Sequence, residues 1–316
     1  MKWGILGAAN IARKAVIPAI QRAGADVVAI ASRSGSAEEM AEEFGIPKSY
    51  GSYEELLNDQ EIEAVYIPVP NHLHKQWTIT AAEAGKHILC EKPAALTHDD
   101  TKQMLESCKE NNVYFLEAFM YQFHPQHERV KELIIAGEIG QVQFMKASFS
   151  FLFDKSTNNI RLEADKGGGA LWDVGCYGIH SSMKILQSTP KTAQGLLHMD
   201  QKHQVDTTTF VQLEMENGTM AQIDCSFDAP MRQAYEVIGT NGTIKVPRAY
   251  RPDKDDHEGL IQLENQNGAY EEKVYGDQYK LQIETLEHAI ANNESLEKYH
   301  ELTLENSRIL EELYRT

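Results

Sequence analysis

Short apolar runs alternate with helical patterns from residue 1 to about residue 120, and this alternation is the strongest restriction on the fold. It is typical of βαβ units, whose strands pair in parallel. The strands that we predict are residues 3–6, 27–31, 64–69, 87–90 and 113–117. We therefore expect residues 1–120 to form an α/β domain around a parallel sheet.

The pattern changes after residue 120. Apolar and polar residues alternate on both sides of Asn217-Gly218, which predicts a β-hairpin, and Asn-Gly recurs at Asn241-Gly242 and Asn267-Gly268. Residues 121–316 are therefore expected to form a second α/β domain with a mostly antiparallel open sheet. Its last helix could also pack back on the first domain. The charged stretch 248–259 is predicted to be an exposed loop.

The composition narrows the class of protein. Thirty basic and 47 acidic residues give a formal net charge of −17, which argues against nucleic acid or an anionic membrane as a partner. The four cysteines are scattered, so neither a zinc knuckle nor a disulfide framework is indicated. We find neither a signal peptide nor a run of about eighteen apolar residues, and we expect a soluble cytoplasmic protein.

A glycine-containing turn connects the first predicted strand to the first helix. Its spacing approximates G-x-G-x-x-G/A, the pattern that holds a dinucleotide pyrophosphate at a helix N-terminus, although alanine replaces the middle glycine. The alternative is a tight turn that binds no ligand. The candidate cofactor-binding residues here are Gly7, Ala8, Ala9, Asn10 and Ile11.

The end of the second predicted strand bears on the choice of cofactor. An NAD site usually has an acidic residue there, whereas this chain has Ser32, Arg33 and Ser34. This strand end has no carboxylate that would repel the 2′-phosphate of NADP. Arg33 could form an ion pair with that phosphate or stack on the adenine ring. This favours NADP, with NAD still possible. The alternative for Arg33 is an ordinary solvated surface residue.

Glu91-Lys92-Pro93 follows the buried run 87–90. Proline cannot continue a hydrogen-bonded ladder and pushes the preceding residue towards extended conformations. Lys92 is therefore expected at the carboxyl end of a strand, where open α/β sheets bind their ligands.

A third segment, after the glycine triplet 167–169, carries Asp173, Tyr177 and His180. These three side chains share a face if the segment is helical. Hydride transfer between an alcohol and a nicotinamide needs groups that hold the carbinol and move its proton. Taken singly, each residue could instead be a cap, an ion-pair partner or a packing residue.

These segments, together with Pro70-Asn71-His72-Leu73-His74 and the stretch 115–126, resemble the Gfo/Idh/MocA oxidoreductase family over essentially the whole chain. The branch that they resemble contains NADP-dependent sugar and dihydrodiol dehydrogenases. The resemblance implies an N-terminal Rossmann dinucleotide-binding domain and a C-terminal α/β domain. In relatives the open sheet of the second domain often forms a dimer interface, so a homodimer or a dimer of dimers is expected.

The resemblance also assigns roles. It implies that Lys92 is the catalytic lysine, that Tyr177 shuttles the proton and that Asp173 is the acid of the motif. His180 and Arg161 are expected to contact substrate, and Gln122 stands where close relatives often have arginine. The remaining implied cofactor contacts are Pro70, Asn71, His74, Glu91 and Lys92 itself.

The prediction is an NADP-preferring dehydrogenase or reductase acting on a sugar, polyol or related small molecule, without a metal. Three alternatives stay open. The pairs His72-x-His74 and His124-x-x-His127 could hold a metal. The protein could instead be a non-catalytic regulator that binds NAD(P), or a redox-neutral NAD-dependent glycosidase.

Overall fold

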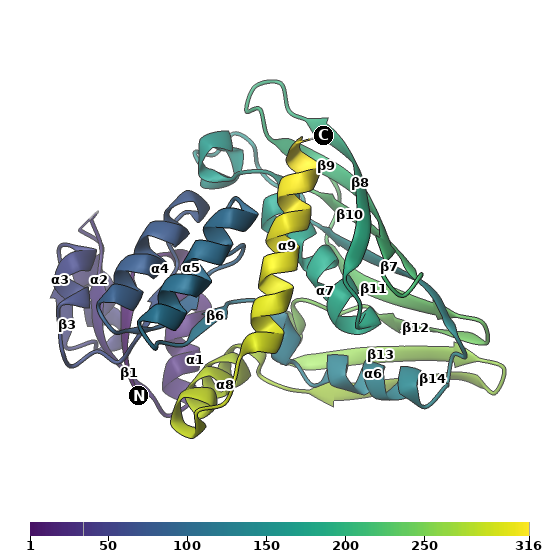
Figure 1. The fold of residues 1–316 in the computed structure, drawn as a ribbon, viewed down its shortest axis with the longest axis horizontal. Coiled ribbons are helices and arrows are strands. Elements are labelled where there is room, and N and C mark those ends of the chain that lie inside the picture. Colours follow the sequence, from purple (N-terminus) through teal and green to yellow (C-terminus); the bar gives the residue numbers. More distant parts are fainter. Residues whose placement is uncertain (34, 316) are drawn as a thin grey trace. The chain divides into compact units, whose positions relative to one another are not determined.

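The computed structural model describes residues 1–33 and 35–315, and it divides into two compact units. Unit 1 comprises residues 1–119 and 279–304, and unit 2 comprises the remaining described residues. Helix α8 (Gln278–Asn292) lies almost wholly in unit 1, whereas α9 (Glu297–Arg315) begins in unit 1 and ends in unit 2. Figure 1 labels the elements along the chain.

Unit 1 contains a six-stranded sheet of order β3-β2-β1-β4-β5-β6, in which every neighbouring pair is parallel. This confirms the predicted Rossmann-type sheet. The three-residue strand β3 escaped prediction because it is too short to show a period. The strands are β1 (Lys2–Leu6), β2 (Asp26–Ala31), β3 (Lys48–Tyr50), β4 (Ala64–Ile67), β5 (His87–Cys90) and β6 (Phe115–Glu117).

The connections of unit 1 are mostly helical. The helix after Glu91-Lys92-Pro93 is capped by Thr97, whose hydroxyl accepts a hydrogen bond from the backbone N–H of Asp100 at 3.0 Å. The helical segments are η1 (Ala12–Val16), α1 (Ile17–Arg22), α2 (Ala37–Phe44), α3 (Tyr53–Leu57), η2 (Asn71–Leu73), α4 (His74–Glu83) and α5 (His98–Glu110).

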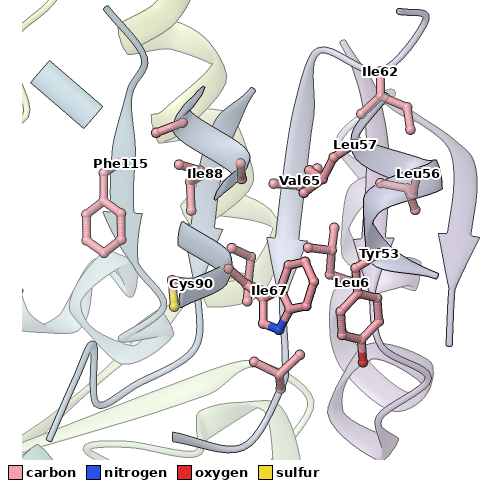
Figure 2. Close-up of a cluster of buried hydrophobic side chains, with 14 of the residues drawn as sticks. Leu6, Tyr53, Leu56, Leu57, Ile62, Val65, Ile67, Ile88, Cys90 and Phe115 are labelled. Atoms are coloured by element: carbon pink, nitrogen blue, oxygen red, sulfur yellow. The ribbon is translucent and has the colours of Figure 1, made fainter. Parts of the chain in front are cut away.

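A buried apolar cluster packs α3, α4 and α5 against the sheet of unit 1 (Figure 2). Leu6, Ile67 and Cys90, the last residues of three neighbouring strands, all belong to it and are fully buried. Burying a large apolar side chain stabilises the fold by about 2 kcal/mol. The core therefore fixes the positions at which β1, β4 and β5 end and the loops beyond them begin.

Unit 2 contains an eight-stranded sheet of order β14-β13-β12-β11-β7-β10-β9-β8. Within the described residues of this sheet, only the β7–β10 pair is parallel, so the predicted mostly antiparallel sheet is confirmed. The strands are β7 (Val142–Ser150), β8 (Pro190–Met199), β9 (Asp206–Met215), β10 (Met220–Ser226), β11 (Arg232–Gly239), β12 (Gly242–Val246), β13 (Glu258–Asn265) and β14 (Gly268–Tyr275).

Unit 2 also contains helices and short helical turns. Within the part of the chain that the structure describes, no helix has both the length and the apolar character needed to cross a membrane. The segments are η3 (Met120–Phe123), α6 (Gln126–Ile135), η4 (Ile160–Leu162), η5 (Ala164–Lys166), η6 (Leu171–Gly175), α7 (Cys176–Leu186) and η7 (Pro252–Lys254).

The predicted hairpin at Asn217-Gly218 is present, and it joins β9 to β10. The prediction of an exposed loop over 248–259 is wrong in part. Ala249 and Tyr250 are fully buried, and β13 begins at Glu258. Charged neighbours in the sequence concealed the burial of these two side chains.

Candidate functional site

The loops of unit 1 that carry the predicted site residues leave one edge of its sheet. In a parallel sheet all carboxyl ends lie at the same edge, and the strand order reverses between β1 and β4. Ligands of open α/β sheets bind at such a reversal. The residues at this edge are Gly7 after β1, Ser32 and Arg33 after β2, Pro70 and Asn71 after β4, and Glu91 and Lys92 after β5.

The turn after β1 has the geometry that the glycine motif predicts. Gly7 has a φ of +132°, a conformation that L side chains rarely adopt. The next four residues, Ala8 to Ile11, are partly or fully exposed, and the following helix starts there. Because the first N–H groups of a helix lack intrahelical partners, this turn can accept an anionic group such as a pyrophosphate.

The end of β2 presents a cation at its surface. Arg33 is exposed, and its guanidinium carbon lies 5.2 Å from the centre of the Tyr53 ring. The Ser32 hydroxyl is 3.0 Å from that of Ser36. Ser34 lies outside the described residues. The exposed guanidinium fits a bound phosphate, because arginine forms bidentate hydrogen bonds with phosphate oxygens.

Three buried groups fix the loop that carries Lys92. The Tyr66 hydroxyl donates to Oε1 of Glu91 at 2.5 Å, and Nδ1 of His74 lies 2.8 Å from the carbonyl oxygen of Pro93. The Ala94 N–H donates to Oε1 of Glu117 at 2.7 Å. The lysine side chain itself is partly exposed, and its peptide bond to Pro93 is cis. The loop is therefore held on both sides of Lys92.

His74 was predicted to contact the cofactor, and the structure buries it completely. Its Nε2 lies 2.8 Å from the carbonyl oxygen of Val69, so the ring bridges the loops that follow β4 and β5. Burial lowers its pKa to about 4, which keeps the ring neutral at pH 7. An effect of His74 on a bound cofactor would therefore pass through these two loops.

In unit 2 the glycine triplet leads into a continuous helical segment. Residues 171–175 form a π-helical turn, and α7 continues from Cys176. A Cβ on Gly168 would lie 2.7 Å from the carbonyl oxygen of Arg161, and Gly169 has a φ of +119°. The glycines thus allow the chain to pack closely against its own backbone.

Asp206 holds the start of this helical segment, and the sequence analysis missed it. Its buried carboxylate accepts hydrogen bonds from the Leu171 N–H at 2.8 Å and the Thr209 hydroxyl at 2.6 Å. The Tyr314 hydroxyl also donates to it, and the Tyr314 ring stacks on Trp172. A lone aspartate in a strand and a tyrosine at the chain end carry no local signal of this contact.

Two predicted site residues form an ion pair. Nε of Arg161 lies 2.6 Å from Oδ2 of Asp173, and its Nη2 lies 3.2 Å from Oδ1. The Asp173 charge raises the pKa of Arg161. The guanidinium also lies 6.0 Å and 5.9 Å from the ring centres of Phe151 and Phe153. Charge and aromatic faces together orient Arg161.

Tyr177 and His180 lie deeper in unit 2. The Tyr177 side chain is 5% exposed, and its hydroxyl donates to Sδ of Met120 at 3.4 Å. His180 is 1% exposed, and its Nδ1 lies 2.6 Å from the Tyr121 hydroxyl. Burial lowers the pKa of His180 to about 3. The helical spacing is as predicted, but a role of His180 in substrate binding would act through Tyr121.

Three of the four histidines considered as metal ligands, His74, His124 and His127, contact other groups of the chain. Nδ1 of His127 lies 2.9 Å from the Tyr235 hydroxyl, and its Nε2 lies 3.0 Å from the Ala249 carbonyl oxygen. Nε2 of His124 contacts the carbonyl oxygen of His257 at 3.1 Å. Among residues 1–33 and 35–315, no group of three or more His, Cys, Asp or Glu side chains could hold a metal ion.

Comparison with known proteins places both halves of the chain. Residues 1–119 match the model of an oxidoreductase family with an NAD-binding Rossmann fold, and residues 127–245 match the GFO/IDH/MocA C-terminal domain. The chain is 36% identical over 317 residues to D-xylose 1-dehydrogenase (NADP(+)) 2 of Haloferax volcanii, covering 100% of this chain and 97% of the relative. It is 32% identical to trans-1,2-dihydrobenzene-1,2-diol dehydrogenase of Xenopus tropicalis, covering 78% and 75%.

A solved structure resembles the whole chain. KijD10, a 3-ketoreductase from Actinomadura kijaniata in complex with NADP and TDP-benzene, superposes with a TM-score of 0.94 at 28% sequence identity. The match covers 100% of this chain and 97% of KijD10. With both family models and the full-length relatives in agreement, the chain belongs to the GFO/IDH/MocA oxidoreductase family.

Proposed function

We propose that this protein is an NADP-dependent dehydrogenase or reductase that transfers a hydride to or from a CH–OH or C=O carbon of a sugar or sugar-like compound. The observation that carries the proposal is Lys92, a partly exposed lysine in the loop after β5 of a Rossmann-type sheet. Relatives over the full chain length include an NADP-dependent sugar dehydrogenase, and KijD10 was solved with NADP.

The residues of unit 1 fit an NADP molecule. Gly7 and the exposed turn after it suit the pyrophosphate, and the exposed Arg33 suits a 2′-phosphate. Pro70, Asn71 and Glu91 would line the path from this turn towards Lys92. The bound nicotinamide supplies the hydride acceptor or donor, and this chain supplies the groups that hold the substrate and move its proton.

We assign the proton chemistry to Lys92 and Tyr177. In the oxidation direction, the hydroxyl proton of the substrate passes to a basic group while the carbon loses a hydride. A lysine amine can accept that proton, and a tyrosine hydroxyl can relay it and donate a hydrogen bond to the developing oxyanion. The Arg161–Asp173 pair would bind substrate hydroxyls, and His180 would keep Tyr121 in place.

We also propose that the protein assembles as a dimer through the outer face of its eight-stranded sheet. Apolar side chains occur on this face as cross-strand neighbours. Leu196 is 74% exposed and pairs with Phe210, and Met220 is 51% exposed and pairs with Phe144. Clusters of exposed apolar residues mark association surfaces. Size-exclusion chromatography with light scattering checks the mass, and Phe210→Asp should shift it towards the monomer.

The test of function combines a binding and a turnover measurement. NADPH and NADH fluorescence is titrated with the purified protein, and NADP⁺ reduction is then followed with D-xylose and related sugars. Tight NADPH binding with sugar-dependent reduction supports the proposal. NADPH binding without reduction of NADP⁺ by the tested sugars, and without oxidation of NADPH by the tested ketosugars, would favour a regulator. Product formation without net NADPH change would favour a redox-neutral glycosidase.

A further inference from the structure

Glu117 is a buried acid that the proposed reaction does not yet use. It is the last residue of β6, where it pairs with Cys90 of β5, and it is 3% exposed. Its Oε1 accepts the hydrogen bond from the Ala94 N–H, two residues beyond Lys92. Its Oε2 is buried, and the side-chain hydroxyl of Thr303 also interacts with this carboxyl group. Burying a carboxyl group costs free energy unless hydrogen bonds or a charge partner compensate for it, so the presence of Glu117 here calls for an explanation.

Electrostatics connects this acid to the lysine. Burial raises the pKa of Glu117 to about 7, whereas the Thr303 hydroxyl, the Ala94 N–H and the Lys92 charge lower it. Glu91, which lies in the same loop as Lys92, raises the pKa of Glu117 because it carries a like charge. The favourable interaction with Lys92 is mutual, because a carboxylate that is stabilised by an ammonium stabilises that ammonium equally.

We propose that Glu117 is a positioning residue for Lys92, which fixes the loop through Ala94 and holds a buried negative charge within electrostatic reach of the ammonium. The importance of this interaction for catalysis rests on the proposed function, whereas the interaction between Glu117 and Lys92 itself does not. Three other titratable groups lie around the loop: Glu91, the neutral His74 of α4 and Cys90 of β5. The carboxylate of Glu91 accepts a hydrogen bond from Tyr66.

The direction of the expected change in the pKa of Lys92 follows from the charge that a substitution of Glu117 removes. Replacing Glu117 by glutamine keeps the size and an oxygen that can accept from the Ala94 N–H, but it removes the negative charge. The protonated form of Lys92 then loses a stabilising neighbour, so the pKa of its amine should fall by about one unit. The effect should grow above pH 7, where Glu117 is ionised in the wild type.

The experiment measures Lys92 directly. The full-length protein is treated briefly with acetic anhydride across a pH series, and acetylation of the peptide containing Lys92 is quantified by mass spectrometry. In Glu117→Gln the midpoint of the Lys92 reactivity profile should fall by about one unit, while the profile of Lys102, an exposed residue of α5, stays in place. Glu110→Gln, the same substitution at an exposed position of unit 1, is the control and should leave both profiles unchanged.

An unchanged Lys92 midpoint in a folded Glu117→Gln protein would overturn the proposal. If that variant does not fold, Thr303→Val decides, because loss of the hydroxyl should raise the pKa of Glu117, protonate more of this carboxyl at pH 7 and so increase the rate of Lys92 acetylation at that pH. An unchanged rate of Lys92 acetylation at pH 7 would overturn the proposal as well. The labelling needs neither cofactor nor turnover, so its outcome is separate from a failure of the proposed enzymatic activity.

Discussion

The guanidinium of Arg161 and the carboxylate of Asp173 form a two-point ion pair, with N–O distances of 2.6 and 3.2 Å. The side chain of Asp173 is 16% exposed and that of Arg161 is 38% exposed, so solvent reaches the pair mainly from the arginine side. Paired in this way, Asp173 is not an isolated base, and Arg161 is not an isolated cation. We propose that the two residues present a substrate with one polar surface that can both donate and accept hydrogen bonds.

A double-mutant cycle tests this relationship. Arg161→Ala and Asp173→Ala should each reduce kcat/KM, and the double variant should lose little more than the worse single variant, because either change breaks the same pair. The turnover of all four proteins is measured with one substrate. Losses that simply multiply would contradict the idea of a shared surface.

Lys92→Met tests the proton chemistry. The methionine keeps the length of the side chain and removes its proton-carrying amine, so we expect kcat to fall about 10²- to 10⁴-fold with little change in NADPH affinity. Steady-state kinetics and NADPH titration measure the two effects. Lys102→Met, at an exposed position of α5, is the control and should behave like the wild type. Near-normal turnover of the Lys92 variant would contradict the proposed role of Lys92 in proton transfer.

Arg33→Ala tests the choice of cofactor. Loss of the exposed guanidinium should weaken NADPH binding about tenfold or more, since a charge-assisted hydrogen bond contributes about 1.5–3 kcal/mol. NADH, which has no 2′-phosphate, should be affected much less. The dissociation constants of both cofactors are compared by fluorescence, with exposed Arg22→Ala as the control. An equal loss of affinity for the two cofactors would mean that Arg33 does not bind the 2′-phosphate.

Thr97→Ala tests the cap of α5. The change removes the acceptor for the Asp100 N–H and should destabilise the start of the helix by about 1 kcal/mol. Hydrogen exchange of peptides that cover the first turn should become faster. Ser107→Ala, inside the same helix, should leave exchange unchanged or slow it slightly, because alanine is the better helix former. Equal exchange in Thr97→Ala and wild type would show that the cap contributes little.

The buried Glu117 predicts a specific pH dependence of stability. Its pKa is raised from 4.5 to about 7, so the folded protein holds this proton more tightly than the unfolded chain does. The stability that it contributes is present below pH 4.5 and is lost as the pH rises through 7, by about 3 kcal/mol in all. Glutamine does not titrate. The Tm of Glu117→Gln relative to wild type should therefore rise between pH 5 and pH 8.

Calorimetry at the two pH values measures this difference, and parallel Tm profiles would contradict the prediction. His74 has the opposite linkage, because its pKa is lowered to about 4 and its stabilising contribution is lost as the pH falls from 6.5 towards 4. Both proteins keep His74, so its contribution cancels in the comparison.

Local patterns determined much of this protein. Periodicity predicted the parallel sheet of unit 1 and the antiparallel sheet of unit 2, because side-chain spacing follows directly from helix and strand geometry. The turn at Gly7 and the hairpin at Asn217-Gly218 depend on neighbouring residues only, and the sequence alone was enough to predict them. Lys92 could be placed at a strand end because Pro93 follows it.

Tertiary structure decided which distant groups meet. The contacts of Asp206 with Leu171 and Tyr314, and of Glu117 with Ala94, join residues that are remote in sequence, and no local period encodes them. The burial of Tyr250 within a charged stretch was also invisible beforehand. Strand order and register bring such groups together, and both arise from the packing of the whole core. The sequence therefore predicted the candidate residues, whereas only the fold could show which contacts hold those residues in place.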